Sequence, residues 1–424
     1  MPNSSARPWY STVTRYQWLV LLVASLGWVF DAFEGQIFNL TRKSMLAEIL
    51  GKPVDSSEVK AWGDIVLVFF LVGGTVGGAV FGRLADRWGR SPTMIVTIVF
   101  YSVFSGLTYF AENLGQICAL RFLVAMGVGG EWAVAAALVA EVFPPAARAR
   151  ASGIFHASSV LATWMAGLTG LWVGAEWRLA YVVGVAPALL TLWVRASIRE
   201  PARLKNAQRA MGNRVGSFRE LFGHSLWRRR ALAGMTLAAV GLGTFWGITV
   251  AGQDLMSDLL TRLGMAKDQV EREARFAYGI VQATGGGLGM LAFGPICERI
   301  GRRRTFALMQ GLALVVVPAV CFLPQTQSQM LMALPVMGFV TMSMHAGFAV
   351  YFPELFPDHL RATGSSFCFN TGRLLAAPIL FFSGQIKAMV ELPIAVTLIS
   401  GLFFIGLAVL WLLPETQGQE LPEA

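Results

Sequence analysis

Long apolar stretches follow one another along this chain, with short polar segments between them. Each holds about 20 residues, the length that an α-helix needs to cross the hydrocarbon core of a bilayer. The first is too long for a cleavable signal peptide and has no small-residue cleavage site, so we count it as a span. The pattern predicts an all-α, polytopic membrane protein with twelve transmembrane helices, at residues 17–40, 61–82, 92–112, 117–142, 152–174, 178–196, 231–252, 276–297, 305–323, 329–352, 365–386 and 393–413.

The composition agrees with this pattern. Of the 424 residues, 55% are hydrophobic and 14% are charged, whereas soluble domains carry roughly 25% charged residues. A chain this apolar does not stay in solution, so the lipid bilayer is its first expected partner. We expect the protein to work in the bilayer as a monomer.

The net charge of +9 would suit a nucleic-acid-binding protein, but the positions of the basic residues argue against nucleic acid as a partner. With the N-terminus inside, the inner loops and termini hold 22 Lys and Arg residues, and the outer segments hold 10. Cytoplasmic loops of membrane proteins carry such an excess, so we predict that both termini are cytoplasmic. No long outer loop follows the first span, which favours a bacterial cytoplasmic (inner) membrane.

Two unrelated motifs recur at almost the same offset. GRLADRWGR, at Gly82–Arg90, and GPICERIGR, at Gly294–Arg302, both have the form G-x-x-x-(D/E)-R-x-G-R and lie 212 residues apart. EVFPPAAR, at Glu141–Arg148, and ELFPDHLR, at Glu354–Arg361, share E-x-F-P-x-x-x-R and lie 213 residues apart. A common offset indicates an internal duplication.

The duplication predicts an N-terminal six-helix bundle (1–196), a basic cytoplasmic central loop (197–229) and a C-terminal six-helix bundle (230–424). In the first motif, we expect the glycines to allow tight turns and Asp86 to begin the next helix and hold an Arg. GGTVGGAVFG before it has glycines at the spacing that lets a neighbouring helix approach closely.

Paired G-x-x-x-(D/E)-R-x-G-R loops in a six-plus-six chain resemble the major facilitator superfamily over essentially the whole length. RFLVAMGVGGEW from Arg121, the E-x-F-P-x-x-x-R motifs and RATGSSFCFNTGR up to Arg373 resemble its metabolite–proton symporters. These include carriers of sialic acid, aromatic acids and small carboxylates. PETQG at Pro414 resembles the end of the related sugar porters. The resemblance implies two pseudosymmetric bundles with a central site that opens to each side of the membrane in turn.

The resemblance also implies a cytoplasmic charge network that closes the inner side. By position, its members are Asp86, Arg87, Arg90, Glu141, Arg148, Glu298, Arg299, Arg302, Glu354 and Arg361. A loop that only supplies inner positive charge is the alternative, and it does not explain the repeat. Compared with other branches of the family, the seventh span lacks the paired glutamines of hexose carriers, and the fifth lacks the Gly-Pro signature of drug–proton antiporters.

Charged residues inside spans are candidate functional groups, because a charge at mid-bilayer costs about 2.5–3.5 kcal/mol on insertion scales. In GWVFDAFEGQIF, Asp31 and Glu34 share a helical face, and Arg121 of the fourth span lies at matching depth. We hypothesise that Arg121 pairs with ionised Glu34 and releases it on protonation, which would make Glu34 a proton-coupling group. A permanent ion pair is the alternative. Glu131 is either a second proton carrier or a hydrogen-bonded structural group.

Two comparisons within the family support this hypothesis. Sugar–proton symporters have an acid in the first span and an Arg in the fourth at matching places. D-A-F-E also resembles the two-acid motif of aromatic-acid carriers, although the second acid there is usually Asp.

Arg373, in the eleventh span, has no acid at comparable depth in the second half. Because Arg binds carboxylates through two parallel N–H groups, we predict an anionic substrate as its partner. A cap on backbone carbonyls or a bond to a first-half acid is the alternative. Further candidates for the substrate site are Asn370, Gln282, Tyr278, Phe245, Trp246 and His345. We interpret His156 and His345 as core histidines rather than as proton relays.

The sequence lacks the motifs that several other functions require. It has no P-loop, no H-E-x-x-H or G-x-S-x-G motif and no Cys/His cluster, so we expect no enzyme activity, no metal and no cofactor. The four cysteines, at positions 118, 297, 321 and 368, have no metal-ligand spacing and are expected to pack. The predicted function is transport of a small carboxylate with protons. The alternatives are a sugar or zwitterion carrier, an exchanger or exporter, and a sensor that has lost transport.

Overall fold

The computed structural model describes residues 8–54, 56–173, 176–185, 193, 198, 200 and 202–423. All regular secondary structure in these residues is helical, which confirms the predicted fold class. The α-helices are α1 (Arg15–Leu50), α2 (Ser57–Trp88), α3 (Arg90–Thr108), α4 (Leu114–Val142), α5 (Pro145–Ala157), α6 (Ser159–Val173), α7 (Trp177–Val183), α9 (Ala202–Met211), α10 (Phe218–Gly223), α11 (Ser225–Thr244), α12 (Ala251–Arg262), α13 (Lys267–Phe276), α14 (Ala283–Ile300), α15 (Arg302–Phe322), α16 (Gln327–Leu355), α17 (Arg361–Ser366), α18 (Gly372–Met389), α19 (Leu392–Ser400) and α20 (Leu402–Val409). Three π-helical turns, η3 (Phe245–Thr249), η4 (Ala277–Gln282) and η5 (Phe367–Thr371), join α11 to α12, α13 to α14 and α17 to α18. Short 3₁₀ turns are η1 (Trp9–Thr12), η2 (Gly212–Arg214) and η6 (Leu410–Leu412).

Nine helical runs among the described residues are long and apolar enough to cross a membrane. They correspond, within a few residues at the ends, to the first four predicted spans, the seventh to tenth, and the twelfth. The fifth predicted span is divided between α5 and α6, and the eleventh runs through α17, η5 and α18. α7 covers the start of the sixth, most of which lies outside the described residues. Two predicted spans are therefore built from shorter helical pieces.

α1 extends ten residues past the predicted end of its span at residue 40. Polar residues do not stop a helix, and no breaker occurs before Gly51, whose φ of 61° is left-handed and favours glycine. At its start, Thr14 and Gln17 form a capping box. Sequence hydropathy therefore marked the apolar section, whereas capping residues set the ends of the helix.

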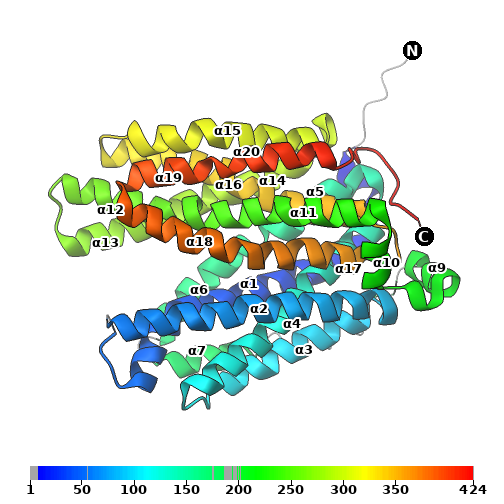
Figure 1. Cartoon of the computed structure of the whole chain (residues 1–424), viewed down its shortest axis with the longest axis horizontal. Helices are drawn as coiled ribbons and strands as arrows, with labels where there is room; N and C mark the ends of the chain where they lie inside the picture. The colour runs from blue at the N-terminus through cyan, green and yellow to red at the C-terminus, as the bar shows by residue number, and fades with distance from the viewer. Residues whose placement is uncertain are drawn as a thin grey trace.

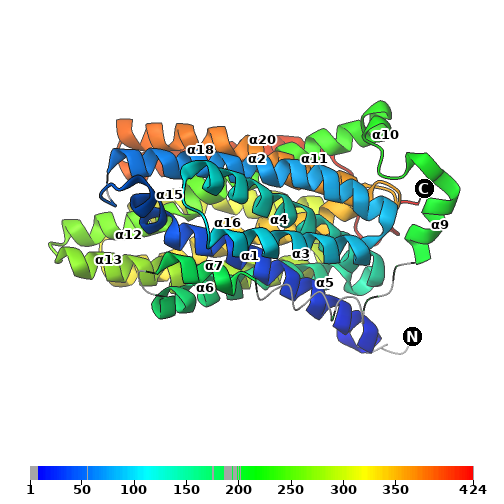
Figure 2. The same ribbon diagram turned by 90° about the horizontal axis from the view of Figure 1, so that it is seen from below.

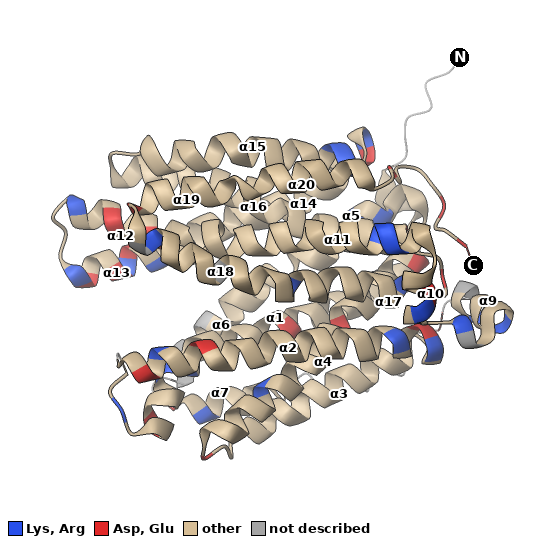
Figure 3. Ribbon diagram, in the orientation of Figure 1, with Lys and Arg blue, Asp and Glu red and all other residues tan. Residues whose placement is uncertain are grey.

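The helices run along one long axis, as Figures 1 and 2 show. α1 begins at the same end as the C-terminus, α9 and α10, which we call the termini end. The α12–α13 pair marks the opposite end, which we call the hairpin end. Figure 3 shows that most charged residues gather at these two ends and leave the middle sections of the helices largely uncharged. That distribution suits a protein whose middle section lies in hydrocarbon.

The first and second halves of the chain meet along two related helix pairs. α5 packs against α14, and α17 packs against α2. The motif offsets of 212 and 213 residues place α17 at the position that α5 has in the first half, and α14 at the position of α2. The two contacts are therefore copies of one contact, which gives the interface approximate two-fold symmetry.

Glycines let α2 and α4 approach closely. A Cβ atom added to Gly77 would lie 2.0 Å from the Met126 carbonyl oxygen, and one added to Gly129 would lie 2.2 Å from the Gly74 carbonyl oxygen. Both contacts are with backbone atoms, which cannot rotate away. Small residues at this spacing have the role in helix packing that the sequence predicted.

We expect Gly77→Ala to destabilise the protein by at least about 2 kcal/mol, because overpacking against a fixed backbone forces the two helices apart. Gly311→Ala is the matched control: Gly311 also lies inside a long helix, but nothing lies within 4 Å of its added Cβ, so the melting temperature should stay the same or rise. Thermal unfolding in one detergent measures both variants. Equal melting temperatures would contradict the close α2–α4 contact.

One glycine makes each turn between the helices of the two motif loops. Gly89 between α2 and α3 has φ 116°, and Gly301 between α14 and α15 has φ 98°, a region that L side chains rarely adopt. An added Cβ would also meet the Glu200 carboxylate at 2.6 Å in the first case and the Glu415 carboxylate at 2.5 Å in the second. The second glycine of the motif is thus required for two reasons.

The connection between the halves is partly helical, whereas the sequence analysis expected a polar loop. It contains α9 and α10, and it contacts both halves at the termini end. Gln208 donates hydrogen bonds to the carbonyls of Asp86 and Arg87, and the Gly216 N–H donates to the His359 carbonyl at 2.8 Å. The described part of the connection is therefore docked on the bundle.

Candidate functional site

A cavity of about 250 Å³ is lined by helices of both halves. Aromatic side chains form much of its wall: Trp28, Phe38, Phe70, Phe245, Trp246 and Phe369. Polar residues also belong to its lining: Asp31, Gln36, Asn39, His156, Ser159, Thr163, His345 and Arg373. Apolar walls with a small number of polar groups are typical of small-molecule sites.

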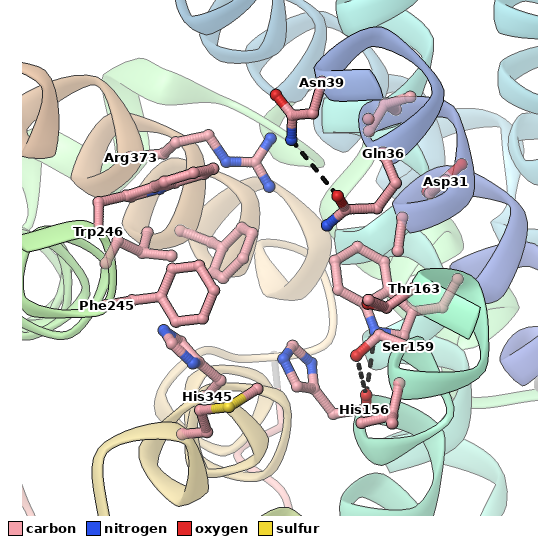
Figure 4. Close-up of a pocket in the computed structure, with 18 of the residues that line it drawn as sticks. Asp31, Gln36, Asn39, His156, Ser159, Thr163, Phe245, Trp246, His345 and Arg373 are labelled. Carbon is pink, nitrogen blue, oxygen red and sulfur yellow. Dashed lines mark hydrogen bonds between the residues drawn. The ribbon is translucent and has the colours of Figure 1, made fainter. Parts of the chain in front are cut away.

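Arg373 is a cation without an acidic partner in this cavity. Among the described residues it has neither an ion pair nor a hydrogen bond; its guanidinium lies 5.1 Å from the centroid of the Phe369 ring. Figure 4 shows the guanidinium between Trp246 and the Gln36–Asn39 pair, facing the open space. An acid from the first half is near, because Asp31 interacts with Arg373 electrostatically without forming an ion pair.

The structure brings some of the predicted substrate residues together and separates others. Phe245, Trp246 and His345 line the cavity with Arg373. Asn370, Gln282 and Tyr278 do not belong to its lining. The Asn370 amide donates to the Gly129 carbonyl at 2.8 Å, across the interface of the halves, and the Gln282 amide donates to the Thr249 carbonyl at 2.7 Å. Asn370 and Gln282 lie in π-helical turns, whose wider winding changes the face that a side chain occupies.

Glu34 and Arg121 form the buried pair that the sequence analysis placed at matching depth. The Arg121 guanidinium donates to Glu34 at 2.7 Å, and the Ser105 hydroxyl donates to the other carboxylate oxygen at 2.7 Å. Arg121 also lies over the rings of Phe38 and Tyr181. Two of its nitrogens, Nε and Nη1, have no hydrogen bond. The pair therefore depends on one charged hydrogen bond, and either group can be released without dismantling a larger network.

The carboxylates of Asp31 and Glu131 have fewer hydrogen-bond partners than that of Glu34. Neither carboxylate oxygen of Asp31 has a hydrogen bond of normal geometry, although the Tyr101 hydroxyl is near. Glu131 accepts from the Thr97 hydroxyl at 2.5 Å through one oxygen, and its other oxygen has no partner. Asp31 lines the cavity and Glu131 does not. Of the four predicted proton-coupling residues, Asp31 is thus the one that lines the cavity.

At the termini end, a first cluster of charges ties the halves together. Arg90 pairs with Asp86 at 2.5 Å and with Glu141 at 2.7 Å, and Glu141 also accepts from Arg361 of the second half at 2.9 Å. The sequence analysis expected Asp86 to begin the next helix, but Asp86 lies in the last turn of α2. Its carboxylate accepts from the backbone N–H groups of Ala362 and Thr363, at the start of α17.

A second cluster has the same arrangement with the roles of the two halves exchanged. Glu354 accepts from Arg302 at 3.0 Å through both oxygens, and Arg148 of the first half lies 3.8 Å away. Glu298 pairs with Arg150 of α5 at 2.6 Å. All three ion pairs between the halves in the described residues, which are Arg361–Glu141, Arg148–Glu354 and Arg150–Glu298, lie at the termini end. This end is closed.

Two of the predicted network members lie outside these clusters. Arg87 donates to the Val215 carbonyl of the central connection. Arg299 is exposed and has no ion pair with the described residues.

Sequence reasoning missed several members of the closed end. Glu200 accepts from the backbone N–H groups of Arg90 and Ser91, and Glu415 accepts from those of Arg302 and Arg303. Partial burial raises the pKa of the Glu200 carboxyl, and these hydrogen bonds act in the opposite direction. Both acids stand beside a proline just after the last span of a half, and this repeat could have identified them. Asp358, which pairs with Arg361, and Arg150 were also missed.

We expect Glu141→Gln to weaken the closed end, because it removes the only carboxylate that contacts both Arg90 and Arg361 among the described residues. The ratio of closed to open molecules should fall about tenfold. This effect is smaller than the roughly 3–5 kcal/mol that is typical for breaking a buried pair. Spin labels at exposed Arg83 and Arg299 would report a longer distance. The four native cysteines are buried and should not compete for the label.

Glu298→Gln is the control for this experiment. Its pair with Arg150 is partly exposed, with 27% of the Arg150 side chain and 16% of the Glu298 side chain accessible, so solvent screening should make its effect smaller. The same distance distribution in wild type and Glu141→Gln would show that Glu141 does not stabilise the closed end.

Together, the features of this chain define a class of protein. Membrane-length helices in two related halves enclose a cavity, and ion pairs close one end of it. That architecture is the one used by secondary transporters, and the protein is an integral-membrane transporter rather than an enzyme. It belongs to the Major Facilitator Superfamily, whose family model matches residues 24–381.

Curated relatives and solved structures agree with this assignment. The chain is 28% identical to the "Probable 4-methylmuconolactone transporter" of Cupriavidus pinatubonensis, covering 97% of this chain and 93% of the relative. It is 24% identical to the sialic acid transporter NanX of Escherichia coli, covering 94% and 96%. The proton:xylose symporter XylE has the same fold, with a TM-score of 0.76 at 17% identity, covering 96% of this chain and 98% of that one.

Proposed function

We propose that this protein carries a small organic acid across the membrane together with protons, by alternating access of the central cavity. The observation that carries the proposal is Arg373: a guanidinium in an aromatic cavity with no acidic partner among the described residues. A carboxylate would supply the missing partner through two parallel hydrogen bonds. The relatives support an acid, since sialic acid is a carboxylate at neutral pH and one relative is named for its transport.

The proton would be carried by acids of the first half. Asp31 lines the cavity, has no hydrogen bond of normal geometry and interacts with Arg373. When ionised, Asp31 competes with the substrate for Arg373 and repels its carboxylate. Protonation removes both effects, so a proton and an anion would bind together. Glu34 and Arg121, joined by one charged hydrogen bond, would respond to the same event by separating and reforming.

The conformation supports uptake from the outer side. All described ion pairs between the halves lie at the termini end, and the excess of basic residues in the loops of this end supports a cytoplasmic position for it. We therefore propose that the cavity faces the outside in this conformation, in a bacterial inner membrane, with both termini cytoplasmic. The protein would work as a monomer, because both sides of the cavity come from one chain.

A ligand screen tests the proposal. Purified protein would be titrated with monocarboxylates, dicarboxylates, sugar acids and neutral sugars at pH 5.5 and pH 7.5, and thermal stability would be measured. A ligand at a hundredfold excess over its Kd stabilises the folded state by about 2.7 kcal/mol. We expect a carboxylate to stabilise the protein more at pH 5.5, because protonated Asp31 no longer competes. Stabilisation by a neutral sugar alone, equal at both pH values, would overturn the proposal.

A further inference from the structure

Two histidines from opposite halves stand side by side in the cavity, away from Arg373. His156 belongs to α5 and His345 to α16, and their ring centroids are 6.3 Å apart with the planes inclined by 27°. Both line the cavity, and their exposures are 4% and 7%. Figure 4 shows both rings at the end of the cavity opposite the Arg373 guanidinium. Neither ring is needed for the carboxylate contact or for the proton-coupling step.

The proton position on His156 follows from its neighbour. The Trp132 indole N–H donates to His156 Nδ1 at 3.2 Å. An indole nitrogen can only donate, so Nδ1 must be the acceptor and the proton of the neutral ring lies on Nε2. No hydrogen bond joins Nε2 to another described residue. His156 therefore offers a hydrogen-bond donor to the cavity.

The proton position on His345 is the opposite one. Its Nε2 is buried and has no hydrogen-bond partner. The Gly241 carbonyl of α11 faces the ring, and since Nε2 has no partner, the nitrogen beside this carbonyl is Nδ1. A carbonyl can only accept, so the proton of the neutral ring lies on Nδ1. His345 Nε2 is left as an acceptor.

We propose that His156 and His345 form a second subsite that recognises a hydroxyl group on the substrate, at a distance from the carboxylate held by Arg373. A hydroxyl oxygen accepts from His156 Nε2–H and its proton is donated to His345 Nε2, so one group satisfies both rings. A carbonyl oxygen can satisfy only His156, and a methyl or hydrogen satisfies neither. The aromatic walls suit a flat ring between the two polar ends. The class of substrate is thus a hydroxylated, ring-containing carboxylic acid.

This inference rests on the proposed function and adds the group that selects among acids. A buried nitrogen without a partner costs free energy, and a site built to bind a hydroxyl strongly rejects an analogue that lacks it. The two rings also belong to different halves, so a hydroxyl between them links the halves across the cavity.

The test compares ligands that differ by one hydroxyl. Binding of benzoate, 3-hydroxybenzoate and 4-hydroxybenzoate to the purified full-length protein would be measured by calorimetry. We expect at least one hydroxybenzoate to bind about tenfold more tightly than benzoate, which corresponds to about 1.4 kcal/mol and lies within the range for a hydrogen bond. In His156→Phe and His345→Phe this preference should disappear, so that benzoate and the hydroxybenzoates bind to each variant with equal affinity. His224→Phe, at an exposed position on the central connection, should retain the preference.

The outcomes separate the two proposals. If benzoate and both hydroxybenzoates bind equally to the wild type, or if the His variants keep the preference, the hydroxyl subsite is wrong while the carboxylate site stands. If none of the three acids binds, the subsite for hydroxylated ring acids is wrong, and the wider carboxylate screen decides the proposed function separately. The wild-type comparison needs no substitution, so the test survives a variant that fails to fold.

Discussion

Replacing Arg373 with alanine is expected to raise the Kd for a transported carboxylate at least about a hundredfold. Hydrogen bonds to charged groups contribute roughly 1.5–3 kcal/mol each, and a carboxylate would take two from this guanidinium. Because Arg373 has no ion pair among the described residues, its removal leaves no acid stranded at hydrogen-bonding distance. The unliganded variant should therefore melt at or above the wild-type temperature, since an unpaired buried cation is itself costly.

Two further variants sharpen this prediction. Arg373→Lys keeps the charge but loses the forked geometry, so it should recover only part of the affinity. Arg299→Ala removes an exposed arginine without an ion pair in the described structure, and its affinity should be unchanged. Calorimetry and thermal shift on the same preparations measure both quantities. Carboxylate uptake by Arg373→Ala with the wild-type KM would mean that this arginine is part of the scaffold.

Asp31→Asn is expected to abolish accumulation of substrate driven by a pH gradient, while exchange of labelled for unlabelled substrate continues. The amide resembles a permanently protonated acid: it does not compete for Arg373, and it cannot release a proton on the other side. In proteoliposomes, accumulation should fall to the level of passive equilibration. The fold should tolerate the change, because neither Asp31 oxygen has a hydrogen bond of normal geometry to lose.

Glu34→Gln provides the comparison. It leaves Arg121 without its only carboxylate partner among the described residues, and breaking a buried pair typically costs about 3–5 kcal/mol. We therefore expect a lower melting temperature together with impaired coupling. If Glu34→Gln loses gradient-driven accumulation and Asp31→Asn keeps it, the proton is carried by Glu34. If accumulation follows the pH gradient in both variants, neither acid couples protons.

Much of the candidate site could be predicted from the sequence, because buried charge in a membrane is rare and therefore informative. The depth argument paired Glu34 with Arg121, and the two are in contact. The absence of a second-half acid near Arg373 was also read from sequence alone. The argument did not extend to Asn370 and Gln282, because polar residues in spans can be satisfied by backbone carbonyls of neighbouring helices, as both amides are.

The surroundings of His156 could not be predicted from the sequence. His156 was interpreted as a core residue because sequence gives no measure of what faces an imidazole. Its cavity position depends on how α5 is rotated against α16, and its proton position depends on Trp132, which comes from α4. A residue whose role depends on three helices cannot be assigned from spacing within one of them.

Composition, hydropathy and the repeated motifs determined by themselves that this chain is a duplicated helical membrane protein, because a bilayer permits few ways to satisfy the backbone. That it is a carrier followed from the resemblance of its motifs to a known family. They also identified the charges that matter, since each buried charge must have a purpose or a partner. Only the tertiary structure decided which partner each charge has: that Asp86 caps α17 of the other half, that Glu298 pairs with Arg150, and that Arg373 faces a cavity. Those choices depend on helix rotation and on contacts between residues more than a hundred positions apart, which the order of residues along one helix does not specify.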